Sequence, residues 1–560
     1  MSEIDFFDRN IRALTQTNPH AASRLSGVHV RHAQYKIVGS RSGERVPAAI
    51  DANGTVHALH STMDPGREAK RLIDASDEGF IVLLGLGGGF YAEAALEREE
   101  TGTVLVIEFD CEGFAELLSL LDYSRIFTNP RFRLLVDNSE AEIGQTILSL
   151  YQPVLFGGIR VIPLRPRTVL GSEAFIMAAN AVETAIGRVS ADYSVQAHFG
   201  KRWFSNTVRN LMRLGENRET PPEIHRAAVC AAGPSLLPQI ERLKKNREGL
   251  FLIATDTSLP CLLNGGIKPD AVISIDCQHI SYHHFMTGNF RNSDGPPEET
   301  LLFLDLASPP LLAAMSKRKH FFTGGHPLTR YISQICMPLP ELDTSGGNVT
   351  YTAVSLAERL GADEIELYGA DFSYQNGVTY ARGTYIYPIF ESRQNRLLPL
   401  EAQASAFLYR TPLEKKENHA WYYETGTMKN YRERLEEKCR YMKAALIPVE
   451  GLGAPISVRQ GENRSRNAKT FSCGKPMMKA EDFLRFYREE ITGLPEPLKN
   501  SGAYLSLLSD GQRIVITTIL PTAAAVKKRI NAADFREVFE ETRAFCLKEI
   551  DTVLGSFQKK

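Results

Sequence analysis

Short apolar runs alternate with amphipathic stretches along most of the chain, and this pattern predicts strands alternating with helices. The clearest series follows residue 223 and continues to about residue 455. Its expected strands are AAVCAAG, FLIATD, AVISID, TLLFLDL, HFFTGG and EIELYGAD. Runs this short and this apolar indicate strands buried on both faces of a mostly parallel sheet. The fold class we expect is α/β, with a Rossmann-like central sheet and a second Rossmann-like region before it.

Three regions separate by pattern along the chain. The first contains a Gly-rich strand-to-helix segment, and a connecting helix is expected near residues 190–215. A helix near the C-terminus is expected because its apolar positions trace one face: Phe535, Val538, Phe539, Thr542, Phe545 and Cys546. We therefore expect three domains: a Rossmann-like domain with its linking helix (1–215), a central α/β domain (216–455) and a helical C-terminal domain (456–560).

Length, charge and cysteine usage narrow the class of protein. A chain of 560 residues is too long for a single core, and 43% of it is hydrophobic. Its 65 basic and 66 acidic residues leave a net charge of −1, so no global field favours nucleic acid. No apolar run reaches the roughly eighteen residues of a membrane span. Eight cysteines without a CxxC pair, and an acidic N-terminus without an apolar signal segment, indicate a reduced, cytoplasmic protein.

Polar residues follow several of the expected strands, at the ends where α/β sheets bind ligands. After AAVCAAG, the turn of Gly233, Pro234 and Ser235 opens a helix and offers backbone N–H groups and a hydroxyl. FLIATD and AVISID end in Asp256 and Asp276, and Asp276 is a candidate for substrate contact. A nucleotide seat is one interpretation of the Gly-Pro-Ser turn, and an ordinary capped turn is the other.

A second Gly-containing turn precedes the helix NVTYTAVSLAERLG. Thr344 and Ser345 offer hydroxyls there, and Gly346 allows close backbone approach. A capped helix start explains this segment equally well when it is taken alone.

The last apolar strand runs directly into Asp371, and two tyrosines, Tyr374 and Tyr380, flank the turn Gln375-Asn376-Gly377. Phenols can donate hydrogen bonds to a departing phosphate without a metal. A surface turn with tyrosines packed at its edges is the alternative. Because three such features lie at carboxyl strand ends of one expected sheet, a shared binding site is the better explanation.

Three histidines, His279, His283 and His284, follow AVISID. No carboxylate lies at ligand spacing in this stretch, so we expect solvent-facing or supporting histidines and no metal site.

The N-terminal region has a Gly-rich turn of its own, with Gly85, Gly87 and Gly89 after a strand and Glu108 at the end of the next. This is the layout of a nucleotide or S-adenosylmethionine loop, with the acid on ribose hydroxyls. It resembles a class I methyltransferase core only loosely. A non-catalytic or regulatory domain is our preferred interpretation over an active methyltransferase.

The segment TSGGNVTYTAVSLAERLGADEIELYGADFSYQNGVTY, with AAGPSL upstream, resembles the motility-associated factor proteins. These are flagellin nonulosonic-acid glycosyltransferases, grouped with 6-hydroxymethylpterin pyrophosphokinase (MptE-like) proteins. Their central domain is similar to bacterial sialyltransferases that use CMP-activated sugars. The resemblance covers roughly residues 220–455.

The resemblance implies a nucleotide-binding role for Gly233, Pro234 and Ser235, although Ala232 stands where the sialyltransferases have Asn. It also implies that the segment 344–346 lies near the cytidine.

The tyrosines that hold the CMP phosphate in the sialyltransferases match Tyr374 and Tyr380, with Ser373 as a one-residue insertion, and Asp371 matches the Asp ending that strand. The catalytic histidine of those enzymes lies downstream, where His419 is the only histidine. His419 could take the acceptor proton, or it could pack beside the neighbouring aromatics.

The implied function is transfer of a pseudaminic- or legionaminic-type sugar from a CMP donor to Ser or Thr of flagellin, without a metal or other cofactor. A pyrophosphokinase using ATP and Mg²⁺ is an alternative, with Asp256, Asp276 and Asp371 as its carboxylates. A non-enzymatic flagellin assembly factor is another. The aromatic, loop-rich segment 382–424 is expected to form a lid, an acceptor surface or a contact in a homo-oligomer.

Overall fold

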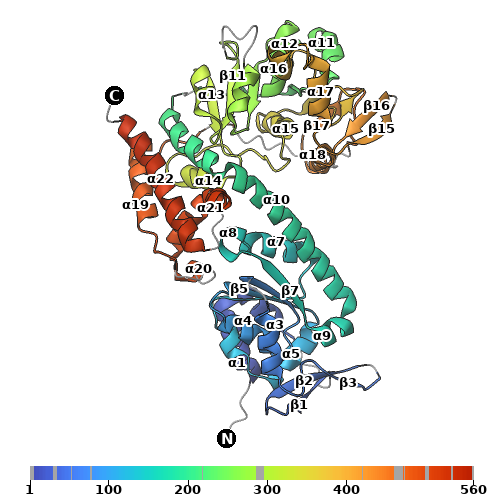
Figure 1. The fold of residues 1–560 in the computed structure, drawn as a ribbon, viewed down its shortest axis with the longest axis vertical. Coiled ribbons are helices and arrows are strands. Elements are labelled where there is room, and N and C mark those ends of the chain that lie inside the picture. Colours follow the sequence, from blue (N-terminus) through green and yellow to red (C-terminus); the bar gives the residue numbers. More distant parts are fainter. Residues whose placement is uncertain are drawn as a thin grey trace. The chain divides into compact units, whose positions relative to one another are not determined.

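The structure is a computed structural model (Figure 1). It describes residues 6–28, 34–51, 53–75, 78–216, 219–285, 295–418, 420–458, 471, 473–497, 504–530 and 534–557. Contacts divide the chain into two compact units. Unit 1 comprises Met1–Lys201 with Ile491–Phe545, and unit 2 comprises Arg202–Glu490 with Cys546–Lys560.

Unit 1 contains a four-stranded parallel sheet in the order β6-β5-β4-β7 and an antiparallel sheet β1-β2-β3. Its elements are α1 (Phe6–Thr17), α2 (Pro19–Ser26), β1 (Tyr35–Gly39), β2 (Arg45–Ile50), β3 (Val56–Ala58), α3 (Pro65–Ile73), β4 (Phe80–Leu84), α4 (Phe90–Glu97), β5 (Thr103–Glu108), α5 (Cys111–Leu120), α6 (Ser124–Phe127), β6 (Phe132–Val136), α7 (Glu140–Leu150), α8 (Pro153–Phe156), β7 (Ile159–Pro163), α9 (Arg165–Leu170), α20 (Tyr504–Leu507) and α21 (Asp510–Ile530).

Unit 2 is built on a seven-stranded sheet in the order β12-β11-β10-β9-β8-β13-β17, with every pair parallel. Its elements are η1 (Leu211–Arg213), β8 (Arg226–Cys230), α11 (Leu236–Lys245), β9 (Phe251–Thr255), η2 (Asp256–Ser258), α12 (Leu259–Asn264), β10 (Ala271–Ser274), η3 (His279–Phe285), β11 (Leu301–Asp305), α13 (Pro310–Met315), β12 (Lys319–Phe322), α14 (Pro327–Ile335), α15 (Val349–Arg359), β13 (Glu364–Tyr368), β14 (Tyr374–Gln375), α16 (Ile386–Arg393), α17 (Leu400–Leu408), β15 (Glu414–Asn418), β16 (Ala420–Glu424), α18 (Gly426–Cys439) and β17 (Ala445–Pro448).

The α/β class and the six central strands expected from the sequence are confirmed. Alternate residues of these strands share one core with α15 and α18, including Val229, Ile273 and Phe303. The residues between them are also buried, as are the apolar faces of α11 and α12. Both faces of the sheet are therefore covered, which explains why its strands are apolar throughout.

Three long helices contain the residues at which the chain passes from one unit to the other. They are α10 (Ser172–Asn210), α19 (Ala480–Thr492) and α22 (Phe535–Phe557). The connecting helix begins earlier than the sequence pattern indicated. The C-terminal helix is present, and Phe535, Val538 and Cys546 on its expected face are buried. The C-terminal helices are distributed between the two contact-defined units, and the three expected domains stay a prediction.

The expectation of a loop-rich segment at 382–424 is wrong. Within it lie α16, α17 and a hairpin of β15 and β16, whose second strand pairs with β14. Its aromatic residues pack on one another across α16 and α17: the Phe390 and Phe407 rings lie 6.2 Å apart. In the described part of the chain, no helix has the length and apolarity needed to cross a membrane.

Candidate functional site

The strand order of the large sheet reverses between β8 and β13, which are neighbours. At such a point the chain leaves adjacent carboxyl strand ends in different directions, and α/β proteins bind ligands there. The two turns that follow these strands are bonded to each other. Gly233 N donates to Gly369 O at 2.8 Å, and Ser235 N donates to Asp371 Oδ2 at 2.8 Å.

Two glycines make this contact possible. A Cβ on Gly233 would lie 2.5 Å from Gly369 O and would overlap the Asp371 carboxylate. Gly369 has a φ of 60°, and its Cβ would lie 2.5 Å from Ala231 O. The Gly-Pro-Ser turn therefore needs its glycine for close approach of the protein's own backbone. Pro234 lies between the two bonded residues and is partly exposed.

Asp371 connects three segments of unit 2. Gln375 Nε2 donates to Asp371 Oδ1 at 2.7 Å and to Ser235 Oγ at 2.5 Å, and Leu452 N donates to the same hydroxyl at 3.2 Å. Burial raises the pKa of Asp371, while hydrogen bonds from Ser235 and Gln375 oppose the rise. The hydrogen bonds of Ser235 and Asp371 thus join the segments that frame the site.

A cluster of phenols lies after this framework, and we call it the tyrosine cluster: Tyr374, Tyr380 and Tyr385. The Tyr380 and Tyr385 rings lie 6.2 Å apart. Burial raises the pKa of all three phenols, and the positive charge of Arg410 opposes each rise. The guanidinium of Arg410 also lowers the pKa of Tyr374 through a direct interaction with its side chain. The cluster therefore joins protonated O–H donors to a guanidinium, which is a suitable environment for an anion.

Arg410 is held beside the tyrosine cluster by a neighbouring ring. Its guanidinium carbon lies 3.9 Å from the centre of Phe407, and that ring lies 6.3 Å from Tyr380. The side chain is otherwise exposed. A guanidinium stacked in this way keeps its edge free to donate hydrogen bonds.

Two carboxylates border the tyrosine cluster. Asp256, directly after β9, accepts from Ser274 Oγ at 2.6 Å and from Thr257 N at 2.7 Å, and His284 Nδ1 lies 3.3 Å from its Oδ2. Burial raises the pKa of Asp256, but His284 and these hydrogen bonds outweigh it and lower the pKa overall. Burial raises the pKa of Asp276, and the Asp256 charge adds to that rise.

The Thr-Ser-Gly-Gly turn lies beside the carboxyl ends of two other strands, β11 and β12. Thr344 Oγ1 donates to Gly324 O at 2.6 Å, and a Cβ on Gly324 would overlap the Asp305 carboxylate at the end of β11. Ser345 Oγ donates to Asp343 Oδ1 at 2.6 Å. A Cβ on Gly346 would overlap the Tyr351 ring. The contacts of this turn are thus with its own surroundings.

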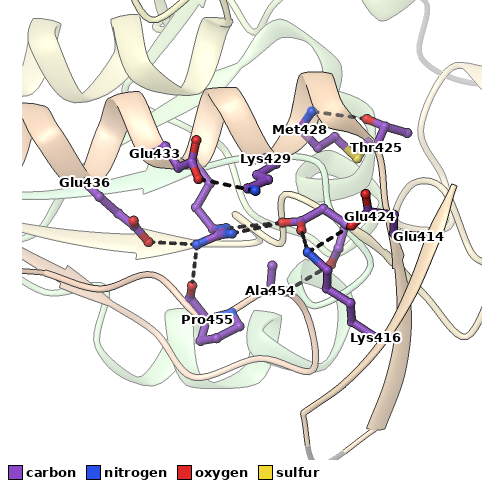
Figure 2. Close-up of polar contacts among 12 residues, drawn as sticks. Glu414, Lys416, Glu424, Thr425, Met428, Lys429, Glu433, Glu436, Ala454 and Pro455 are labelled. Atoms are coloured by element: carbon purple, nitrogen blue, oxygen red, sulfur yellow. Dashed lines mark hydrogen bonds and ion pairs between the residues drawn. The ribbon is translucent and has the colours of Figure 1, made fainter. Parts of the chain in front are cut away.

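The hairpin beside the tyrosine cluster is anchored at its base by Glu424 (Figure 2). This buried carboxylate accepts from Lys416 and, at 3.1 Å, from Arg432 on α18. The strand register then sets Tyr374 opposite Tyr423. His419, the candidate base, lies outside the described residues.

The N-terminal Gly-rich turn is filled by its own surroundings. Gly85, Gly87 and Gly89 have φ values of 97°, 54° and 84°. Gly88 N donates to His60 Nε2 at 2.9 Å, and Tyr123 OH donates to Gly87 O at 2.6 Å.

Glu108 faces the turn from the end of β5. Its Oε1 accepts from Leu86 N at 2.7 Å, and its Oε2 lies 3.4 Å from Arg167 Nε. The carboxylate is fully buried, and burial raises its pKa while Arg167 opposes the rise. The acid expected to bind ribose hydroxyls is bonded inside the protein in this structure.

Sequence reasoning missed Arg410, Tyr385 and the pairing of His284 with Asp256. Of the histidines expected to be solvent-facing or supporting, His279 is exposed and His284 is buried. The run of tyrosines after Tyr380 was the available signal for Tyr385. Arg410 had none, because its position depends on how α17 packs. Among the described residues, no three His, Cys, Asp or Glu side chains are grouped so that they could hold a metal ion.

Residues 202–377 match the family model described as 6-hydroxymethylpterin diphosphokinase MptE-like. Two uncharacterized proteins of Treponema pallidum (strain Nichols) are similar in sequence. One is 33% identical over 167 residues, which cover 29% of this chain and 80% of the relative. The other is 47% identical over 92 residues, 16% of this chain and 32% of that relative, so the match spans about a third of its length.

The solved structure of a MAf glycosyltransferase from Magnetospirillum magneticum AMB-1 has a similar fold. The TM-score is 0.58 at 15% sequence identity, and the superposition covers 98% of this chain and 94% of that one. The likeness therefore extends over the whole chain, beyond the part that the family model matches.

Proposed function

This chain belongs to the MptE-like family, and from that premise we propose that it is a glycosyltransferase of the motility-associated-factor type. It transfers a nonulosonic acid from a CMP donor to a Ser or Thr hydroxyl of flagellin in the cytoplasm. The fold shared with the MAf glycosyltransferase over almost the full chain supports the class of reaction.

The observation that carries the proposal is the tyrosine cluster with Arg410 beside the reversal of strand order. A departing CMP gains negative charge on its phosphate in the transition state. Phenols whose pKa is raised keep their protons at neutral pH and can donate to that charge, and a guanidinium adds a full positive charge. No metal is needed for this stabilisation.

In the proposed reaction the acceptor oxygen forms a bond to the anomeric carbon while the bond from that carbon to the phosphate oxygen breaks. The electron pair leaves with CMP, where Tyr374, Tyr380 and Arg410 meet it. Ser235 and Asp371 hold the two turns together, and the nucleoside lies along the carboxyl strand ends between Asp256 and Thr344.

The proposal is tested by calorimetry and thermal shift of the purified chain with CMP in the absence of added metal. A ligand that binds only the folded state raises the apparent stability. We expect CMP to do so, and Tyr374→Phe/Tyr380→Phe to weaken its binding at least tenfold, since hydrogen bonds to a charged group are worth about 1.5–3 kcal/mol each. Tyr441→Phe is the matched control, because Tyr441 is 80% exposed.

The pyrophosphokinase remains a second candidate because Asp256 and Asp276 follow adjacent strands and the family description names a diphosphokinase. Asp256 already accepts from Ser274 and Thr257 and faces His284, which leaves it few lone pairs for a cation. A response to ATP that requires Mg²⁺, without any response to CMP, would establish this alternative. Flagellin binding that is unchanged in the double Phe variant, with no product formed by the wild type, would instead favour an assembly factor.

A further inference from the structure

A buried carboxylate and a buried imidazole form a pair beside the tyrosine cluster. His284 Nδ1 lies 3.3 Å from Asp256 Oδ2, and the side chains are 9% and 4% exposed. Two adjacent strands position the carboxylate. Asp256 directly follows β9, and Ser274 at the end of β10 donates a hydrogen bond to it at 2.6 Å. The central sheet therefore positions Asp256, and η3 carries His284.

The carboxylate lies 3.3 Å from Nδ1, and its charge acts on the protonation of the ring. A carboxylate facing Nδ1 favours the tautomer with hydrogen on Nδ1, and the lone pair then lies on Nε2. The same carboxylate stabilises the imidazolium that forms when Nε2 takes a proton. The hydrogen bonds that lower the pKa of Asp256 keep it ionised for this task.

The ring of His284 also contacts the tyrosine cluster, with its centre 4.4 Å from that of Tyr385. Tyr385 interacts electrostatically with Asp256, Asp276 and Arg410. The imidazole thus contacts both Asp256 and Tyr385 of the tyrosine cluster.

The titratable groups around His284 come from each element packed against it. Asp256 on η2, Asp276 after β10 and Tyr385 before α16 act on or contact the ring; His283 neighbours it on η3, and α12, which also packs on η3, carries Cys261. Burial raises the pKa of Cys261 to about 11, so its thiol is neutral near pH 7. Asp256 is the carboxylate in contact with the ring.

We propose that His284, oriented by Asp256, is the general base that takes the proton of the acceptor hydroxyl. This inference rests on the proposed glycosyltransferase function. As the acceptor oxygen bonds to the anomeric carbon, its O–H bond breaks and the proton passes to Nε2. The bond from the anomeric carbon to phosphate breaks with its electron pair on CMP. His284 then releases the proton to solvent.

The test compares the pH dependence of CMP release from a CMP-nonulosonate in the full-length wild type, His284→Asn and Asp256→Asn, with flagellin as acceptor. In the wild type, kcat/KM is expected to rise with pH, because a general base acts only in its unprotonated form. His284→Asn should lose this rise and 100-fold or more in kcat, the usual contribution of a general base being about 10²–10⁴. Its CMP-dependent thermal shift should stay unchanged, which shows that the variant is folded.

Asp256→Asn should lower kcat, because the imidazolium that forms in the reaction loses its stabilising charge. His279→Asn on the same short helix is the control, since His279 is exposed. A His284→Asn variant that keeps both the rate and the pH dependence overturns the inference, and so does loss of the pH dependence in His419→Asn alone. A wild type that binds no CMP and releases none overturns the proposed function itself.

Discussion

The two parallel sheets of this protein carry glycine-rich turns at equivalent places, and the turns have different fates. After β4, the turn spends its N–H and C=O groups on His60, Tyr123 and Glu108. After β8 and β13, Ser235 and Asp371 are also bonded internally, but Tyr374, Tyr380 and Arg410 gather beyond them. The first turn is bonded to the protein's own side chains, and the second has proton donors beyond its internally bonded framework.

A glycine-rich turn after a strand is therefore explained first by close packing of the protein's own atoms, and it does not by itself indicate a ligand site. At Gly87, a Cβ would lie 2.5 Å from Leu164 and 2.6 Å from His60, which are the protein's own atoms. The donors that follow the framework distinguish the candidate site from the structural turn.

The largest effect on stability is expected at the N-terminal Gly-rich turn. Glu108→Ala leaves Arg167 buried without its carboxylate, and breaking a buried pair from one side costs about 3–5 kcal/mol. Urea denaturation of the full chain measures this loss. Glu97→Ala should cost under about 1 kcal/mol, because its pair with Lys70 is exposed. Equal stability of the two variants would contradict a structural role for Glu108.

The hairpin beside the candidate site should show an intermediate effect. Glu424→Ala removes charged hydrogen bonds to Lys416 and Arg432 and should cost about 2 kcal/mol. CMP turnover should fall together with stability, because β16 sets the position of Tyr374. Glu433→Ala on α18 is the control (Figure 2), since its contact with Lys429 is exposed at 3.9 Å and should be nearly neutral. Full turnover in Glu424→Ala would separate the hairpin from the site.

A smaller, pH-dependent effect is expected at the Thr-Ser-Gly-Gly turn. Hydrogen bonds from Ser345 and Tyr351 overcome the effect of burial and lower the pKa of Asp343 to about 2. A carboxyl with a lowered folded pKa stabilises the protein above its unfolded pKa, and this contribution is lost as pH falls through the folded value.

Asp343→Asn should therefore cost about 1 kcal/mol at pH 7, a figure reduced for the partial exposure of the side chain. The difference from wild type should shrink between pH 4 and pH 2. Urea titrations at a series of pH values test this, and a difference that grows on acidification would refute the assignment.

The smallest effect is expected when S-adenosylmethionine is added, and it compares the N-terminal turn with the candidate site. S-adenosylmethionine should produce no thermal shift, because His60 and Tyr123 occupy the N–H and C=O groups of the N-terminal turn. CMP should shift the same preparation. A shift with S-adenosylmethionine that Glu108→Gln abolishes would show that the turn opens to receive a ligand.

Several parts of the fold could be predicted from the sequence. The six central strands and the buried face of α22 follow from apolar periodicity, which is local. β17 and the hairpin of β15 and β16 were missed. The hairpin has charged residues on its first strand and aromatic residues on its second, and its pairing with β14 joins segments more than forty residues apart. Such partners cannot be read from a local pattern.

The sequence by itself determined which residues follow each strand, and so it placed Ser235, Asp256, Asp276 and Asp371 at the carboxyl edge of one sheet. The tertiary structure alone decided what each residue faces. The Asp371 carboxylate accepts a hydrogen bond from Ser235 N, Asp256 lies beside His284, and the charge of Arg410 acts on Tyr374. The reason is physical: strand order and helix packing set the distances between residues far apart in the chain, and hydrogen bonds and charges act over only a few ångströms.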